Sequence, residues 1–495
     1  MYLLGFDIGS SSVKAALLDA SNGQCIEEAF SPNHEMKTLA PQIGWAEQDP
    51  ECWWNNLERA AREVINNSGI EPEQIKAIGI SYQMHGLVLI DKNKEVLRPS
   101  IIWCDSRASD IGKKAFNDLG QKFCLDKLLN SPGNFTASKL KWVKENQPEI
   151  FDKIHKILLP GDYIAMKLTG EIQTTESGLS EAILWDFENK QIADFVLKHY
   201  GIDRELIPDI VPTFSVQGLL SSEAADDLGL LAGTPISYRA GDQANNAFSL
   251  NVLNPGDIAA TAGTSGVIYG VSDSLRFDPL SRVNTFLHVN NQVEKTRLGV
   301  LLCVNGTGIL NAWLKNNVAS GNFSYADINK ISQKIPIGTD GLIVLPFGNG
   351  AERMFQDKEI HSHISGLEFN NHSRAHVFRA AHEGIAFALN YGMNIMANMG
   401  IDMSLIRAGK ANMFLSPVFR ETLAGISGAT IELYNTNGAQ GAARAAGLGA
   451  GIFQNRDEAF IGLLKSQVIE PDHSKSDQYC EAYEKWKEVL IMHLD

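Results

Sequence analysis

The sequence lacks most of the short signatures that identify nucleotide-binding and metal-dependent enzymes. It contains no G-x-x-x-x-G-K-[ST] phosphate loop, no G-x-G-x-x-G after a predicted strand, and no H-R-D and D-F-G pair. It also contains no H-E-x-x-H motif, so a zinc site of that type is not expected. Any ATP site in this chain must therefore be of another type.

Cysteines and long apolar stretches are also scarce. The 6 cysteines are scattered without C-x-x-C spacing, which predicts neither a disulfide framework nor a structural zinc site. No apolar run approaches the roughly 20 residues that span a bilayer. The N-terminus enters a predicted strand without the basic region and apolar core of a signal peptide. We therefore expect a cytoplasmic protein with no membrane partner.

Basic residues are too few for a general nucleic-acid-binding surface. The 495 residues include 43 Lys and Arg against 58 Asp and Glu, with a net charge of -15. Nucleic-acid binding requires a basic face, so we expect no such partner. A small anionic ligand remains compatible if hydroxyls, N–H groups, a few cations and a metal surround it. The length predicts two or three domains.

A predicted hairpin opens the chain, with apolar strands on both sides of a polar tip. The tip offers a flexible backbone, N–H groups and hydroxyls that can surround a phosphate: Gly9, Ser10, Ser11 and Ser12. Asp7 ends the first strand, where it could face a metal held by that phosphate, and Lys14 adds a point charge. The alternative is a plain surface hairpin with a Ser-rich turn.

A second hairpin of the same kind is predicted half a chain later, at 258–270. Its tip contains Gly263, Thr264 and Ser265 between two apolar strands. Two domains that each begin with a phosphate-binding hairpin would explain this repeat. We place the boundary in a short connection, with domains at 1–248 and 249–495.

Several single residues invite a chemical interpretation. Asp242 directly follows a predicted strand, where a carboxylate can accept a hydroxyl proton while a phosphoryl group arrives in line. It is otherwise a turn residue bonded to its own backbone. His85, in a loop at a strand end, is either a polyol contact or a structural histidine. For His372, His376 and His382 a surface or packing role is favoured over zinc. The run 438–446 predicts a closely packed helix, because Gly and Ala allow close approach.

Ordered motifs extend over about residues 1–450: Asp7–Lys14, Trp45–Pro50 with Trp53-Trp54, Gln83–Gly86, Trp103–Arg107, Phe135–Val143, Asp242, Gly263–Gly266 and Ser365–Gly384. With them the chain resembles the FGGY carbohydrate kinases, and within this family the xylulokinases, which the Q-M-H-G segment marks. Two segments depart from the family pattern. Gly350–Met354 stands where G-E-R-T-P is common, and Ala408–Asn412 where a G-G-G-A adenine loop is usual.

The resemblance implies an α/β fold with two ribonuclease H-like domains of the actin/hexokinase type around an interdomain cleft. It implies ATP-dependent phosphorylation of a ketopentose, D-xylulose to D-xylulose 5-phosphate, with Asp242 as the catalytic base. The implied sugar contacts are Met84, His85, Gly86, Asp105 and Gln243. The implied nucleotide contacts are Gly9, Ser10, Ser11, Ser12, Lys14, Gly263, Thr264, Ser265, Gly409 and Asn412. Mg²⁺ is expected near Asp7 and Asp242.

Two alternatives stay open. One is a kinase for ribulose, gluconate or a tetritol, against which the segment Met84–Gly86 argues. The other is a non-catalytic sugar or nucleotide sensor, which would need neither Asp7 nor Asp242. We expect a small-molecule sugar as the partner, and a homodimer is one option for the assembly, since the sequence does not specify the oligomeric state.

Overall fold

The computed structural model describes residues 1–319, 321 and 323–494 and divides into two compact units. The first unit contains Met1–Asn251, Phe286–Leu298 and Thr436–Leu463, and the second contains Val252–Thr285, Gly299–Asn435 and the described residues from Leu464 onward. The chain thus returns to the first unit twice. The first crossing, after Asn251, lies close to the boundary expected between residues 248 and 249, and segments 286–298 and 436–463 return to the first unit.

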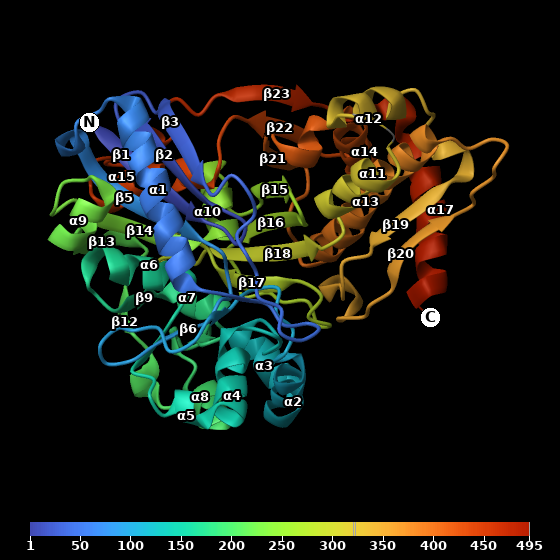
Figure 1. The fold of residues 1–495 in the computed structure, drawn as a ribbon. Helices are drawn as coiled ribbons and strands as arrows, with labels where there is room; N and C mark the ends of the chain where they lie inside the picture. Colours follow the sequence, from blue (N-terminus) through green and yellow to red (C-terminus); the bar gives the residue numbers. More distant parts are fainter. Residues whose placement is uncertain (320, 322, 495) are drawn as a thin grey trace. The chain divides into compact units, whose positions relative to one another are not determined.

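A six-stranded sheet forms the centre of the first unit (Figure 1). Its strands, in spatial order, are β13 (Phe214–Leu219), β14 (Pro235–Gly241), β5 (Ile75–Tyr82), β1 (Tyr2–Ile8), β2 (Val13–Asp19) and β3 (Cys25–Ser31). The hairpin predicted at the N-terminus is β1 and β2, which pair antiparallel. β1 also pairs in parallel with β5, and β5 with β14, so these three strands end at the same edge.

The helix α15 (Gly438–Gly449) packs closely on this sheet, as its small residues predict. A Cβ at Gly5 of β1 would lie 1.9 Å from the Ala439 carbonyl oxygen, and one at Gly79 of β5 would lie 2.0 Å from the Ala442 carbonyl oxygen. Only glycine at these two strand positions lets the backbones approach so closely. The packing explains why the chain returns to the first unit after residue 435.

The helix α1 (Pro50–Ser68) packs on β2 and β3. Asp49 is the N-cap, its side chain accepts the Glu51 N–H, and Pro50 is the first helical residue. In α6 (Pro160–Thr169) the N-cap is Leu159. Asp162 is the third helical residue, and its carboxylate accepts the backbone N–H of Leu159 at 3.1 Å.

The remaining elements of the first unit are short. Its other helices are α2 (Ser109–Leu119), α3 (Gln121–Leu128), α4 (Thr136–Asn146), α5 (Pro148–Phe151), α7 (Glu176–Glu181), α8 (Asp194–Tyr200), α9 (Ser222–Leu228), α10 (Asp242–Ser249) and α16 (Arg456–Ala459). Four two-stranded pairs are β4 (Glu47–Gln48) with β7 (Ser100–Ile101), β6 (Val88–Ile90) with β8 (Lys156–Leu158), β9 (Gln173–Thr175) with β12 (Asp209–Val211), and β10 (Trp185–Asp186) with β11 (Gln191–Ile192).

The second unit is organised around another sheet. Its order is β17 (Asn284–Leu287), β18 (Leu298–Val304), β16 (Gly266–Ser272), β15 (Ile258–Ala262), β21 (Leu405–Gly409), β22 (Thr430–Tyr434) and β23 (Lys465–Ile469). The predicted hairpin is β15 and β16, which pair antiparallel, and β15 pairs in parallel with β21. The central order thus repeats that of the first sheet, which confirms the architectural repeat.

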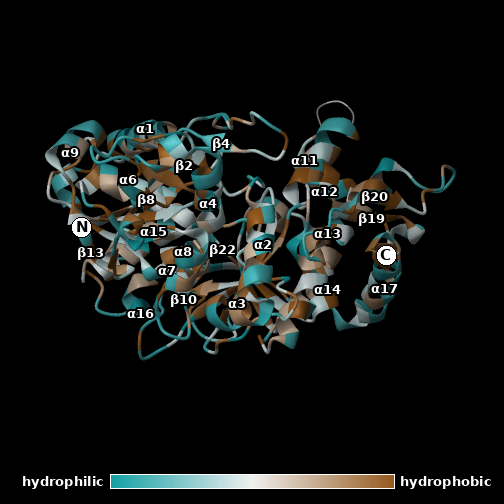
Figure 2. Ribbon diagram, turned by 90° about the horizontal axis from the view of Figure 1, so that it is seen from below, coloured by the Kyte–Doolittle hydropathy of each residue, from teal (hydrophilic) through white to brown (hydrophobic). Residues whose placement is uncertain are grey.

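Helices and a further hairpin complete the second unit. They are α11 (Gly308–Asn317), α12 (Tyr325–Ser332), α13 (Arg374–Asn398), α14 (Pro417–Ser427), α17 (Ser476–Leu494), and the antiparallel pair β19 (Ile343–Phe347) and β20 (His361–Ser365). The hydrophobic strand β19, brown in Figure 2, contributes Leu345 and Phe347 to a core that also contains Phe387 and Trp486.

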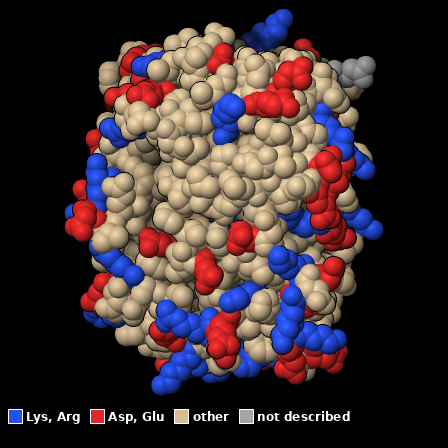
Figure 3. Space-filling view, turned by 90° about the vertical axis from the view of Figure 1, so that its left-hand side faces the viewer, with Lys and Arg blue, Asp and Glu red and all other residues tan. Residues whose placement is uncertain are grey.

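The surface carries charged side chains of both signs (Figure 3). On the face shown in Figure 3, basic and acidic side chains are interleaved, and a broad area carries neither. Within the part of the chain that the structure describes, no helix is both long and apolar enough to cross a membrane.

Candidate active site

The three parallel strands of the first unit end in register. Ile8 of β1 pairs with Tyr82 of β5, and Tyr82 pairs with Gly241 of β14. Ligands of open α/β sheets bind beyond the carboxyl ends of such strands. The structure therefore brings together three features at one edge of one sheet. They are Asp7 with the hairpin tip, the loop 83–87 that contains His85 (the His85 loop), and Asp242.

Asp242 is the first residue of α10 and not part of a free turn. Its side chain is half-buried. Desolvation raises the pKa of the Asp242 carboxyl to about 7, the negative charge of Asp7 adds to the rise, and hydrogen bonds from Gln243 oppose it. A carboxyl group with this pKa can accept a proton near neutral pH.

Asp7 lies on β1 beside the first turn of α15. Its Oδ1 accepts a hydrogen bond from the Ser81 hydroxyl at 2.8 Å. A Cβ at Gly438 would lie 2.5 Å from Asp7 Oδ2, so only glycine leaves room for the carboxylate there. The helix N-terminus favours the negative charge of Asp7.

The donor set of Asp7 and Asp242 fits Mg²⁺ better than a transition metal. Carboxylate oxygens are hard ligands, and Mg²⁺ commonly uses one or two of them together with water and phosphate oxygens. Among the described residues, no group of three or more His, Cys, Asp or Glu side chains could hold a metal ion. Buried His382 contacts Asn311 and Ser416 at 3.1 Å each.

His85 is held in one orientation and one protonation state. Its backbone has a φ of 62°, and its ring lies against Phe135 and Phe286, with centroids at 4.8 and 5.3 Å. Nδ1 lies 3.0 Å from the Glu181 carbonyl oxygen, which can only accept, so Nδ1 carries the proton. Burial lowers the pKa of His85 to about 3, helped by the charge of Lys139. The neutral ring thus offers Nε2 as an acceptor for a hydroxyl.

The neighbours of His85 have different roles. Met84 is buried against β14, because a Cβ at Gly241 would lie 2.7 Å from Met84 Cγ. Gly86 allows close packing, since a Cβ there would lie 2.5 Å from Pro160 Cγ. Gln243, beside Asp242, is half-buried. Met84 and Gly86 therefore shape the loop, whereas His85 and Gln243 carry polar groups.

Asp105, which was expected to contact the sugar, has a full set of partners within the protein. The side chain is fully buried, and its carboxylate accepts the Ala46 N–H at 2.6 Å. It also accepts from Arg107 Nη2 at 2.6 Å and Nε at 2.9 Å. The Arg107 guanidinium in turn stacks 3.8 Å from the ring centroid of Trp45. Asp105 is therefore a structural anchor whose oxygens are already occupied.

Replacing Asp105 by Asn should lower stability and not specifically sugar affinity. The variant keeps the shape but weakens a buried charged pair, which should cost about 1–3 kcal/mol. Urea unfolding measures the loss. The control Asp126→Ala removes a surface ion pair with Lys122 and should cost less than about 1 kcal/mol. If the stability is unchanged and the KM for the sugar is raised, the result would instead support a direct contact between Asp105 and the sugar.

Trp103 and Glu181 are candidate site residues that the sequence reasoning missed. Trp103 is 38% exposed, and its Nε1 lies 3.4 Å from Ser10 Oγ at the hairpin tip. Its position in the W-x-D-x-R segment was the available signal. Glu181 is buried, and a Cβ at Gly241 would lie 3.0 Å from its Oε2. Burial raises the pKa of Glu181 well above its ordinary value, and the charge of nearby Asp242 adds to the rise.

The tip of the first hairpin is partly fixed by the backbone. Gly9 N–H donates to the Ser12 carbonyl at 3.1 Å, and the Ser10 carbonyl accepts from Gln48 Nε2 at 2.7 Å. Ser11 and Lys14 are exposed, and Lys14 lies opposite Asp7 in the antiparallel register of β1 and β2. The side chains of Ser11 and Lys14 are therefore accessible to a phosphate group.

The expected nucleotide residues of the second unit also lie near one another. The carbonyls of Gly263 and Thr264 accept N–H groups from the start of α11, at 2.9 and 3.1 Å. A Cβ at Gly263 would lie 3.5 Å from Asn412 Nδ2, so Asn412 borders this tip. Gly409 ends β21, the parallel neighbour of β15. Ser265 directly precedes β16.

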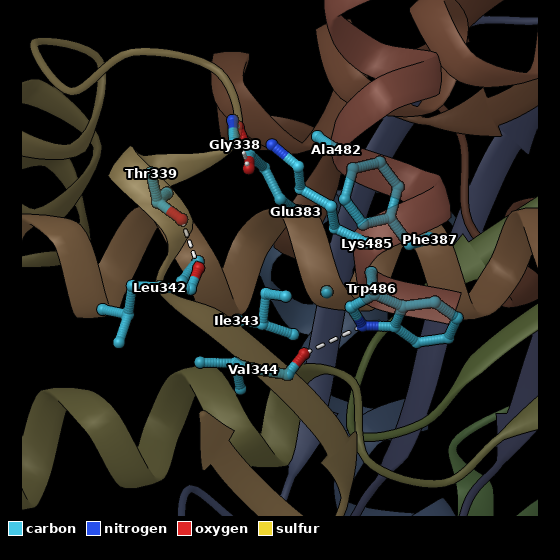
Figure 4. Close-up of a pocket in the computed structure, with 12 residues that line it drawn as sticks. Gly338, Thr339, Leu342, Ile343, Val344, Glu383, Phe387, Ala482, Lys485 and Trp486 are labelled. Atoms are coloured by element: carbon cyan, nitrogen blue, oxygen red, sulfur yellow. Dashed lines mark hydrogen bonds between the residues drawn. The ribbon is translucent and has the colours of Figure 1, made fainter. Parts of the chain in front are cut away.

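A separate small cavity in the second unit contains none of these residues (Figure 4). Trp486 Nε1 donates to the Val344 carbonyl at 3.0 Å, and Glu383 accepts from the Gly338 N–H at 3.1 Å and from Arg379 Nε at 2.7 Å. Its main polar groups are thus paired within the protein, and we assign it no chemistry.

Comparisons with known proteins identify the family of this chain. The N-terminal domain model of the FGGY family of carbohydrate kinases matches residues 2–249, and the C-terminal domain model matches residues 258–450. The chain is 29% identical to the xylulose kinase of Bacillus subtilis, over 99% of this chain and 96% of that protein. The xylulose kinase structure from Rhodospirillum rubrum shares 25% identity with a TM-score of 0.87, covering 99% of both chains. A gluconate kinase structure from Lactobacillus acidophilus, 23% identical, has the same fold, with a TM-score of 0.89 and coverage of 100% of this chain and 98% of that chain. The chain belongs to the FGGY family of carbohydrate kinases.

Proposed function

We propose that this ATP-dependent sugar kinase phosphorylates a ketopentose, with D-xylulose as its substrate. The observation that carries the proposal is the placement of His85 and Asp242 at paired ends of neighbouring parallel strands. One residue offers a neutral acceptor for a sugar hydroxyl, and the other a carboxylate that can take a proton near neutral pH. The xylulose kinases of Bacillus subtilis and Escherichia coli, each 29% identical, support the choice of sugar.

Asp242 is proposed as the base. It accepts the proton of the terminal sugar hydroxyl while the oxygen attacks the γ-phosphorus and the bond to the β-phosphate oxygen breaks. His85 and Gln243 orient the sugar. The hydroxyl groups of Ser10–Ser12 are proposed as phosphate ligands in the first unit, and the polar groups of the tip 263–265 are proposed as phosphate ligands in the second unit. Mg²⁺, when bound near Asp7 and Asp242, supplies charge neutralisation for the phosphates. Catalysis in this account is positioning and electrostatic stabilisation.

The substrate alternatives differ in how the sugar meets the His85 loop. Ribulose, gluconate and tetritols present other hydroxyl arrangements, and the gluconate kinase neighbour shows that this fold is not confined to one sugar. A non-catalytic sensor would have no need for a buried carboxyl group with a raised pKa such as that of Asp242. A pKa shift of this kind is typical of functional sites.

A panel assay of ADP release tests the proposal. The purified protein is given ATP and Mg²⁺ with D-xylulose, D-ribulose, D-gluconate, erythritol or no sugar. We expect the highest kcat/KM with D-xylulose and only slow release without sugar. A higher kcat/KM with another compound would replace the substrate. Sugar binding by calorimetry without any sugar-dependent ADP release would favour the sensor.

A further inference from the structure

A buried lysine connects two segments of the candidate sugar site. Lys139, on α4, is fully buried, and its Nζ donates to the His85 carbonyl at 2.8 Å and to the Ile102 carbonyl at 2.9 Å. Lysine is almost never fully buried unless it is paired, because its ammonium loses hydration. Burial lowers the pKa of Lys139 to about 8, and the charges of Asp105 and the Cys104 thiol act against this. Such a costly group suggests a specific role.

The two carbonyls belong to segments that are distant in the sequence. His85 lies 54 residues before Lys139 and Ile102 lies 37 residues before it. Ile102 directly precedes Trp103, which reaches toward the first hairpin tip. The Lys139 ammonium group therefore connects the His85 loop, through two hydrogen bonds, to the segment 102–103 that contains Trp103.

The His85 loop needs such support because its backbone is strained. A φ of 62° places this non-glycine residue in the left-handed region, which persists only where surrounding contacts enforce it. The contacts are the Glu181 carbonyl on the ring and the Lys139 ammonium on the backbone oxygen. Removing the ammonium leaves two buried carbonyl oxygens without this donor and frees the loop to relax.

We propose that Lys139 is a positioning residue for sugar recognition, which holds the His85 loop and the Trp103 segment in the arrangement that binds the ketose. The proposal rests on the proposed function, because it takes His85 as a sugar contact. Lys139 acts through these segments and takes no part in phosphoryl transfer.

Lys139→Met tests this role, since Met fills the same space without donors. We expect the KM for D-xylulose to rise about tenfold or more, as loss of charge-assisted hydrogen bonds predicts. The KM for ATP and the slow sugar-independent ADP release should change much less than the KM for D-xylulose, because Lys139 contacts the His85 loop directly and reaches the first hairpin tip only through Trp103. The control Lys141→Met, two residues along α4, removes only a partly exposed ion pair with Glu145 and should change neither KM.

The possible results distinguish a failure of the positioning role of Lys139 from a failure of the proposed function. If the wild-type protein shows no sugar-dependent ADP release, the proposed function itself is contradicted. Active wild type with an unchanged KM for D-xylulose in Lys139→Met would overturn the positioning role, as would an equal rise in the KM for ATP. If Lys139→Met does not fold, Lys139→Gln, which stays polar but is one bond shorter, replaces it with the same expected split between the two KM values.

Discussion

Replacing Asp242 by Asn should lower kcat by about 10²–10⁴-fold, the usual contribution of a positioned general base. The amide keeps the size of the side chain at the start of α10 but cannot accept the hydroxyl proton. Binding of D-xylulose, measured by calorimetry, should change little, because His85 and the rest of the sugar site stay in place. Retained turnover in this variant would remove Asp242 from the role of base.

The pH profile gives the same assignment an independent test. The pKa of Asp242 in the folded protein is raised to about 7, so the carboxyl is protonated below this pH and cannot act as a base. We therefore expect kcat/KM for the sugar to rise about tenfold per pH unit below 7 and to level off above it. His85, with a pKa of about 3, should not contribute between pH 5 and 9. A profile that falls as the pH rises from 5 to 7 would contradict this account.

Replacing Gly79 by Val should destabilise the first unit severely. A Cβ there would already lie 2.0 Å from the Ala442 carbonyl oxygen, and both partners are backbone within regular elements that cannot move separately. We expect a loss above about 3 kcal/mol, beyond the usual range for overpacking, because the clash involves backbone and not a flexible side chain. Thermal and urea unfolding measure it.

The control for Gly79→Val is on the same strand. Lys76 of β5 is exposed, and Lys76→Ala should change the free energy of unfolding by no more than about 0.5 kcal/mol. Because α15 begins beside Asp7, any Gly79→Val protein that folds should also lose activity. A variant with wild-type stability would show that α15 does not pack on β5 as described.

Local patterns in the sequence predicted much of the fold. The apolar runs on either side of a polar tip located the strands of both hairpins, since this pattern depends on neighbouring residues. The small-residue run correctly predicted a closely packed α15. It did not show that the helix packs on β1 and β5, because those glycines lie more than 350 residues away in the sequence.

The candidate site was predictable only where a residue follows a strand directly. Asp7 and Asp242 were located in this way, and parallel pairing brings their strand ends together. The hydrogen bonds of Asp105 with Ala46 and Arg107 were not predictable, because they depend on tertiary contacts that a motif does not reveal. The role of Lys139 was missed for the same reason, because its two acceptors are backbone carbonyls from remote loops.

The most direct test of the central claim is a ³¹P NMR spectrum of the products formed from ATP and D-xylulose. Proton transfer to Asp242 during attack by the terminal hydroxyl predicts one phosphomonoester signal, coupled to the protons of C5, in an amount equal to the ADP formed. The Asp242→Asn variant should give none in the same time. ADP accompanied only by inorganic phosphate, or a phosphoester on another carbon, would contradict the account.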